Sequence, residues 1–218
     1  MRIGILGGTG IEGRGLALRF AGAGHPVVLG SRSLERAVSS AEACNSLLGR
    51  VAVQGVENSE ALRQAEILFL AVPADQAAAT LSLLRESIAP GTIVVDVTVP
   101  VKFTGGIPEH APRAGPSNSE ALAGYLPPGA SLVGAFKTVP AHLLAEWDRE
   151  LHCDVFVCGD SRAAKEKIMR VVGTIPSLRA VDAGPLRMAR ALEQMTVLAI
   201  WLNRRYETQE SRYTIVGI

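Results

Sequence analysis

The chain has 218 residues, with 22 lysine and arginine side chains against 21 aspartates and glutamates, and a formal net charge of +1. This balance argues against a nucleic-acid or membrane-surface partner, and no apolar run approaches the length of a membrane span. The three cysteines lack a Cys-x-x-Cys spacing, which argues against a disulfide framework and against a metal site. The N-terminus lacks a secretory signal pattern. We therefore expect a cytoplasmic protein with a sizeable core and a small-molecule partner.

The first motif lies at the start of the chain. A strand pattern at Ile3–Leu6 leads into the run Gly7-Gly8-Thr9-Gly10-Ile11-Glu12-Gly13, then a helical pattern, then a second strand pattern at Pro26–Leu29. Strand, glycine-rich turn, helix and strand form the opening unit of a dinucleotide-binding domain. Gly8 is expected to permit the tight turn, Gly10 to let the backbone approach a pyrophosphate, and Gly13 to let the helix pack closely. The free N–H groups of the first helical turn, through Glu12, then face the phosphates.

The end of the second strand indicates which dinucleotide binds. An NAD site usually has an acidic residue there for the ribose 2′-hydroxyl, whereas an NADP site has residues that accept a 2′-phosphate. This chain has Ser31, Arg32 and Ser33, and Arg36 follows one turn later, with no carboxylate before Glu35. Arginine forks and serine hydroxyls suit a phosphate, so the pattern favours NADP. The alternative is that both arginines are ordinary solvated charges.

The remaining chain alternates strand and helix patterns, which predicts an α/β protein with a doubly wound, Rossmann-type parallel sheet. We expect a dinucleotide-binding domain at residues 1–140 and a small α/β extension at residues 141–218. The further strands are predicted at Val51–Val56, Glu66–Val72, Thr92–Thr98, Ser131–Phe136, Asp154–Cys158 and Leu178–Val181. The further helices are predicted at Leu34–Leu48, Ser59–Gln64, Ala74–Ile88, Ala141–Glu150, Arg162–Val172 and Leu186–Asn203.

Three segments stand apart from this alternation. Residues 103–129 are rich in proline and glycine and predict a long loop with a short helix near Ser117–Tyr125, serving either as a lid or as a surface insertion. The helix Leu186–Asn203 is apolar around its circumference, which predicts burial in the core or against another subunit. The tail Ser211–Ile218 has a strand-like pattern and could complete a sheet edge, either of this chain or of a partner.

Ligands of parallel sheets bind beyond the carboxyl ends of the strands. Three such ends carry prolines, which fix the backbone, and together they predict the floor beneath a nicotinamide. Lys137 follows the last of these strands and is the one catalytic candidate, either orienting a substrate or lying as a solvated lysine at a strand end. No Tyr-x-x-x-Lys motif is present, and such sparse acid–base equipment suits hydride transfer between two redox coenzymes. The candidate residues of the floor are Val72, Pro73, Thr98, Pro100 and Ala135.

Five blocks together resemble the NADPH-dependent coenzyme F420 reductases, or deazaflavin:NADP oxidoreductases. The resemblance runs in order over nearly the whole chain and fails only at residues 103–129. It implies that Thr9, Ile11, Ser31, Arg32 and Arg36 hold NADP, that the deazaflavin lies against the nicotinamide, and that the protein is a homodimer. The blocks are Gly7-Gly8-Thr9-Gly10, Gly30-Ser31-Arg32, Lys137-Thr138-Val139-Pro140-Ala141, Val157-Cys158-Gly159-Asp160 and Asp182-Ala183-Gly184-Pro185-Leu186.

Two features depart from the resemblance. Lys137 stands where archaeal members have histidine, and the loop 103–129 lies where the second substrate would approach. The acceptor could therefore be F420, with Lys137, Arg187 or Arg190 near its anionic tail, or another acceptor such as a flavin, metal chelate, imine or carbonyl. A non-catalytic NADP redox sensor is the remaining alternative.

Overall fold

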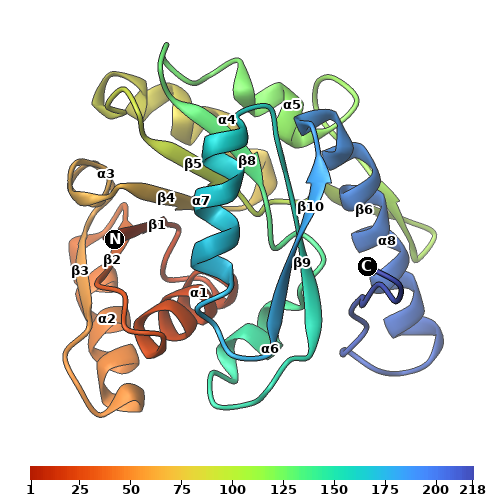
Figure 1. Ribbon diagram of the computed structural model, residues 1–218, viewed down its shortest axis with the longest axis horizontal. Helices are drawn as coiled ribbons and strands as arrows, with labels where there is room; N and C mark the ends of the chain where they lie inside the picture. The colour runs from red at the N-terminus through yellow and green to blue at the C-terminus, as the bar shows by residue number, and fades with distance from the viewer.

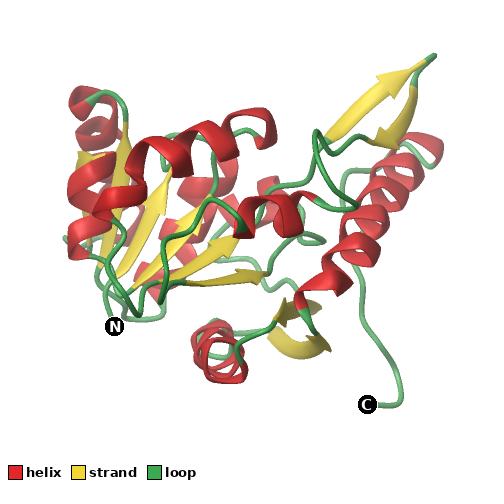
Figure 2. Cartoon of the chain, turned by 90° about the horizontal axis from the view of Figure 1, so that it is seen from above, coloured by secondary structure: helices red, strands yellow, loops and turns green.

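The structure is a computed structural model that describes all residues from 1 to 218. Strands and helices alternate along the chain and form an eight-stranded sheet with helices packed on both of its faces (Figures 1 and 2). The strands of this sheet are β1 (Ile3–Leu6), β2 (Val27–Ser31), β3 (Val53–Glu57), β4 (Ile67–Leu70), β5 (Ile93–Asp96), β8 (Ser131–Gly134), β9 (Cys153–Gly159) and β10 (Leu178–Gly184). The α-helices are α1 (Ile11–Gly22), α2 (Leu34–Leu48), α3 (Asn58–Gln64), α4 (Ala74–Leu84), α5 (Asn118–Ala123), α6 (Ala141–Ala145), α7 (Arg162–Val172) and α8 (Ala189–Arg205), and short 3₁₀ turns occupy Arg85–Ser87 and Leu186–Met188.

The strand order is β10-β9-β8-β5-β4-β1-β2-β3. The chain moves outward from β1 to β3, then crosses back and places β4 on the other side of β1. This reversal creates a crevice at the carboxyl ends of β1 and its neighbours, which is where open parallel sheets bind ligands. All pairs are parallel except β8 with β9. The predicted α/β fold with a Rossmann-type sheet is confirmed.

The core has two layers because successive residues of each strand point to opposite faces of the sheet. In β1, Ile3 and Ile5 belong to a buried cluster of 33 residues under α1, α2 and α7, which also holds Phe20 and Phe69 with ring centroids 4.9 Å apart. Leu6 belongs to the opposite cluster of 19 residues, which lies under α4, α5 and α8. Buried faces on both sides explain why the central strands are continuous apolar runs.

Helix α6 ends at Ala145, earlier than the helix predicted at Ala141–Glu150. The guanidinium of Arg19 on α1 donates to the carbonyls of Leu143 and Leu144 at 2.8 and 3.1 Å, and to those of Glu146 and Arg149 at 2.6 and 2.7 Å. A longer helix would use the first two of these carbonyls internally. The buried guanidinium of Arg19 therefore supplies hydrogen bonds to the backbone carbonyls of an irregular segment, where a helix was predicted.

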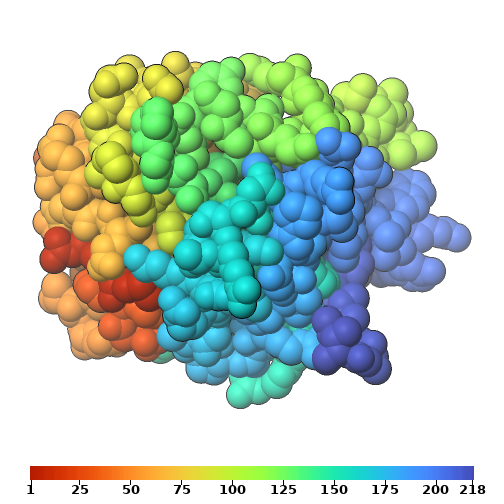
Figure 3. Space-filling model, turned by 45° about the horizontal axis from the view of Figure 1, so that its top comes forward, coloured from red at the N-terminus to blue at the C-terminus, as the bar shows by residue number.

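The segment predicted as a loop at 103–129 contains more order than expected. It begins inside an antiparallel hairpin of β6 (Val101–Thr104) and β7 (Ile107–His110), and α5 confirms the short helix. Gly105 and Gly106 both have positive φ angles, +57° and +85°, and so form the hairpin turn. The hairpin lies against α8 at one end of the molecule (Figures 2 and 3).

Two elements of the C-terminal region differ in the single chain from the predicted ones. The tail after Ser211 forms no strand; it runs beside the start of β9, where the Asp154 backbone N–H donates to the Tyr213 carbonyl at 2.8 Å. Helix α8 is not buried around its circumference, because Leu198 is 49% and Trp201 is 40% exposed. Burial against another subunit stays a prediction.

Residues 141–218 add β9 and β10 to the same sheet, and the predicted boundary at residue 140 stays a prediction. No helix combines the length and apolar character that crossing a membrane requires.

Candidate active site

A cavity of about 350 Å³ opens at the carboxyl ends of β1, β2 and β4. It lies in the crevice created by the reversal of strand order. Its lining residues come from the glycine-rich turn, the end of β2, the start of α3 and the start of α4: Gly7, Thr9, Gly10, Ser31, Arg32, Ser33, Arg36, Asn58, Ala71, Val72, Pro73, Gln76 and Thr80.

The glycine turn has the shape that a pyrophosphate requires. A Cβ on Gly13 would lie 2.6 Å from the Gly7 carbonyl oxygen, which confirms that this glycine lets α1 pack closely on the turn. The positive φ of the turn, +78°, belongs to Gly7 and not to Gly8 as predicted; Gly8 is required because a Cβ there would collide with the Leu29 side chain. Gly10 has no atom closer than 3.5 Å to its missing Cβ, so its backbone is open to a ligand.

The N-terminus of α1 is free to bind an anion. Gly10 is the N-cap residue, and no side chain caps the helix. The first-turn N–H groups and the helix dipole therefore present partial positive charge to the cavity. A dinucleotide pyrophosphate fits these groups.

Glu12, a predicted cofactor-binding residue in this first turn, does not line the cavity. Its Oε1 atom is buried and has no hydrogen-bond partner, and burial raises the pKa of its carboxyl to about 8. A carboxyl group with this pKa is mostly neutral at pH 7, so it does not oppose an anion at the helix end. Ile11, the first residue of α1, is 57% exposed and does not line the cavity either.

The end of β2 carries two arginines without partners. The Ser33 hydroxyl accepts from the Arg36 backbone N–H at 3.3 Å and caps α2, while the Ser31 hydroxyl accepts from the Ser33 N–H at 3.3 Å. The guanidinium groups of Arg32 and Arg36 are exposed and make no hydrogen bond or ion pair in the chain. No carboxylate lines the cavity. This set of donors fits a phosphate on the ribose better than a ribose hydroxyl.

A second cavity, of about 380 Å³, is lined by residues that directly follow those of the first cavity after β4. Pro73 lines the first cavity and Ala74 the second. Lys102 on β6 and Arg113 supply positive charge, and Asp75 supplies a carboxylate. Lys102 pairs with Glu109 at 3.1 Å, whereas Arg113 has no partner in the chain. The remaining lining residues are Val99, Pro100, Val101, Ala111 and Asn118.

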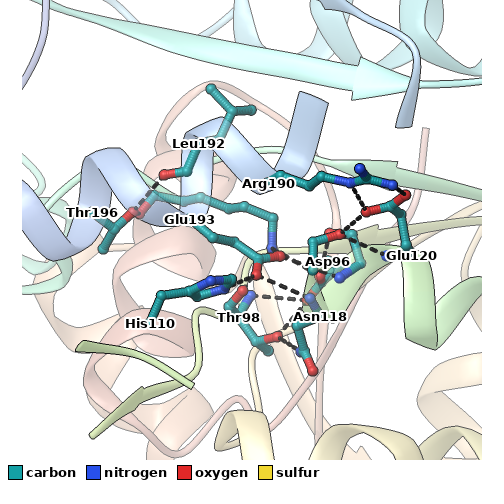
Figure 4. A network of polar contacts seen from close by, with 12 residues as sticks. Asp96, Thr98, His110, Asn118, Glu120, Arg190, Leu192, Glu193 and Thr196 are labelled. Carbon is teal, nitrogen blue, oxygen red and sulfur yellow. Dashed lines mark hydrogen bonds and ion pairs between the residues drawn. The ribbon is translucent and has the colours of Figure 1, made fainter. Parts of the chain in front are cut away.

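Lys137 lies in a buried polar network at the carboxyl ends of β5 and β8. Figure 4 labels Asp96, Thr98 and Glu193 of this network. Its Nζ donates to Asp96 Oδ2 at 2.8 Å and to the Thr98 carbonyl at 2.6 Å, and its side chain is 1% exposed. Burial alone would lower the pKa of Lys137, but the carboxylates of Asp96 and Glu193 raise it above its ordinary value. Phe136 just before it has a φ of +58°, which turns the chain out of β8 toward this network.

Glu193 on α8 joins three elements to this lysine. Its carboxylate is fully buried, lies 3.4 Å from Lys137 Nζ, and pairs with His110 Nε2 at 2.6 Å. It also accepts from the backbone N–H groups of Asn118 and Ser119 at 2.9 and 3.2 Å (Figure 4). The network therefore connects β7, α5 and α8 to the carboxyl ends of β5 and β8, and its member Asn118 lines the second cavity.

The first cavity brings together Thr9, Gly10, Ser31, Arg32, Arg36, Val72 and Pro73 of the predicted site residues, and Pro100 lines the second. Thr98 and Ala135 are buried behind these walls; Thr98 Oγ1 donates to Asp96 Oδ1 at 2.6 Å. Of the arginines expected near an anionic tail, Arg190 is paired with Glu120 at 2.7 Å. Sequence reasoning missed Asn58, Gln76 and Thr80, although each follows the carboxyl end of a predicted strand.

Comparison with known proteins gives consistent results for the whole chain. Residues 2–100 match the family model described as NADP oxidoreductase coenzyme F420-dependent. The F420-dependent NADP reductase of Methanothermobacter marburgensis is 36% identical over all of this chain and 99% of its own length, and that of Methanocaldococcus jannaschii is 31% identical with the same coverage. A crystal structure of a protein from Arthrobacter sp. FB24 covers all of both chains with 26% identity and a TM-score of 0.83.

The glycine turn, the unpaired arginines after β2 and the full-length similarity above 30% identity all point to the same family. The resemblance inferred from the sequence blocks is thereby confirmed. The chain belongs to the family of F420-dependent NADP reductases.

Proposed function

We propose that this protein transfers a hydride between NADP(H) and the deazaflavin coenzyme F420. The observation that carries the proposal is the cavity beyond β1, β2 and β4, in which two unpaired arginines and an uncapped helix end face a space without carboxylates. Relatives of full length are named F420-dependent NADP reductases, which supports F420 as the second substrate.

Different residues of the first cavity bind different parts of the NADP molecule. The N–H groups at the start of α1 bind the pyrophosphate. Ser31, Arg32 and Arg36 bind the 2′-phosphate through charge-assisted hydrogen bonds. Val72 and Pro73 form the apolar wall nearest the second cavity, where the nicotinamide would lie. The two coenzymes supply the hydride chemistry, so the protein's task is to bind and orient them.

The second cavity is the proposed site of F420. Its floor contains Pro100, and Lys102 and Arg113 offer positive charge to the anionic tail of this coenzyme. Lys137 stays a proposed functional residue, as a positioning residue: its hydrogen bond to the Thr98 carbonyl fixes the backbone that leads into Pro100.

We also propose that the protein is a homodimer. The hairpin and α8 pack against each other, and both carry exposed apolar side chains: Phe103 is 55%, Ile107 53%, Leu198 49% and Trp201 40% exposed. A surface of this kind is typical of an interface. A cytoplasmic location is part of the same proposal.

The test is direct. Purified protein is mixed with F420 and either NADPH or NADH, and the visible absorbance of the deazaflavin is followed, with FMN replacing F420 as a control. Bleaching with F420 and NADPH, at least about tenfold faster than with NADH, is the expected result. Tight NADPH binding without bleaching would contradict F420 as the acceptor and would favour another acceptor or a redox sensor.

A further inference from the structure

Two carboxamide side chains line the first cavity without any partner in the protein. Asn58 is the first residue of α3, and Gln76 lies in the first turn of α4. Neither side chain makes a hydrogen bond within the chain, and Asn58 Oδ1 is a buried atom with no donor. Buried polar atoms are almost always bonded, so the unpaired Asn58 Oδ1 is suited to a ligand, and the free Gln76 amide lines the same cavity.

The position of Asn58 is fixed by the sheet. Glu57 is paired with Ser31 in the register of β2 and β3, and Asn58 follows it directly. Its Oδ1 lies 2.8 Å from where a Cβ on Gly30 would be, so only glycine at this place leaves room for the amide. Asn58 therefore lies beside the phosphate-binding end of β2.

Gln76 comes from a different helix and completes the wall. Thr80 follows one turn later on α4 and lines the same cavity, but its hydroxyl donates to the backbone carbonyl of Gln76 at 2.8 Å. The Gln76 side chain is thus the free hydrogen-bonding group that α4 offers here. The two amides and Arg32 border one space next to the proposed 2′-phosphate site.

We propose that Asn58 and Gln76 form a subsite that recognises the adenine base of the dinucleotide. This inference rests on the proposed NADP site and adds its base specificity. Adenine offers an amino donor beside ring-nitrogen acceptors, and a carboxamide can match both through one edge. Because no hydrogen bond holds the Asn58 amide, it can turn about its last side-chain bond and direct Oδ1 to the amino group.

Binding of two cofactors that differ only at this amino group tests the subsite. The cofactors are NADPH and its 6-desamino purine analogue, in which a hydrogen atom replaces the 6-amino group and the ring nitrogens stay acceptors. Their dissociation constants are measured by nicotinamide fluorescence, without any hydride acceptor. The wild-type protein is expected to bind NADPH about tenfold more tightly. Asn58→Ala and Gln76→Ala should each reduce this preference, and the double variant should bind both within about twofold.

Matched variants separate base recognition from other effects. Ser59→Ala, at the adjoining position of α3, should leave the preference unchanged. Arg32→Ala should weaken the binding of both cofactors by the same factor. Thermal unfolding of each variant shows that it is folded. Equal binding of the two cofactors by the wild type would overturn the proposal. It would also be overturned if the amide variants bound both cofactors more weakly by the same factor, because the amides would then contact ribose or phosphate. A protein that discriminates the bases yet does not reduce F420 would refute only the proposed acceptor.

Discussion

Arg32 is the side chain on which the choice between NADP and NAD depends most directly. Its guanidinium has no partner in the chain and borders the cavity at the end of β2. We predict that Arg32→Ala lowers kcat/KM for NADPH by about tenfold or more, since a charge-assisted hydrogen bond contributes about 1.5–3 kcal/mol. The kcat/KM for NADH should change little, because NADH lacks the 2′-phosphate. Steady-state rates with both cofactors make the measurement, with Arg63→Ala, whose guanidinium pairs with Glu60, as control.

Glu12 predicts a pH dependence of stability. Its pKa is raised from 4.5 to about 8 by burial, so the folded protein holds a proton that the unfolded chain releases above pH 4.5. The free energy of unfolding therefore falls as pH rises from about 4.5 to 8, and the full penalty is present above 8. We predict that Glu12→Gln, which cannot ionise, loses less stability than the wild type between pH 6 and 9. Urea unfolding across this range measures the difference, and parallel curves for the two proteins would contradict it.

For single residues, the sequence predicted the positions of those in local motifs better than the contacts between residues from distant parts of the chain. Gly10, Ser31 and Arg32 lie in local motifs whose geometry follows from a few neighbouring residues. The surroundings of Lys137 depend on Asp96 and Glu193, which come from distant parts of the chain. No local sequence pattern indicates that Lys137, Asp96 and Glu193 lie together, so the burial of Lys137 could not be predicted.

At the scale of elements, the buried network around Lys137 holds the hairpin, α5 and α8 to the sheet. We predict that Lys137→Met destabilises the protein by about 3–5 kcal/mol, because it leaves the carboxylates of Asp96 and Glu193 buried without their cation. The melting temperature should fall by about 10 °C. Lys102→Met is the control, since that side chain is 60% exposed and its pair with Glu109 contributes at most about 1 kcal/mol. A Lys137→Met variant as stable as the Lys102→Met control would show that the network does not stabilise the fold.

Elements could be predicted where the sequence had a clear helical period or where a strand was buried on both faces of the sheet. The central strands and α7 follow the predicted ranges closely. The hairpin was missed because Gly105 and Gly106 were attributed to a loop, although two glycines between short apolar runs also suit a turn with positive φ. α6 was predicted too long because its end depends on Arg19, a side chain from another helix.

At the scale of the whole molecule, the exposed apolar surface on the hairpin and α8 predicts self-association. We expect Trp201→Arg to convert a dimer into a monomer, because a charge in an apolar interface is costly to bury. Sedimentation equilibrium measures the mass of both proteins. Leu83→Arg on α4, at a side chain 85% exposed, is the control and should remain dimeric. A wild-type protein that sediments as a monomer would contradict the proposed dimer.

In the proposed reaction, hydride passes directly from NADPH in the first cavity to F420 in the second. The most direct measurement uses NADPH carrying deuterium at both positions of the reactive nicotinamide carbon, in ordinary water, with mass spectrometry of the reduced F420. Direct transfer predicts one deuterium in each molecule of reduced F420. Reduced F420 without deuterium would show that its hydrogen came from solvent, and direct transfer between two adjoining coenzymes would be contradicted.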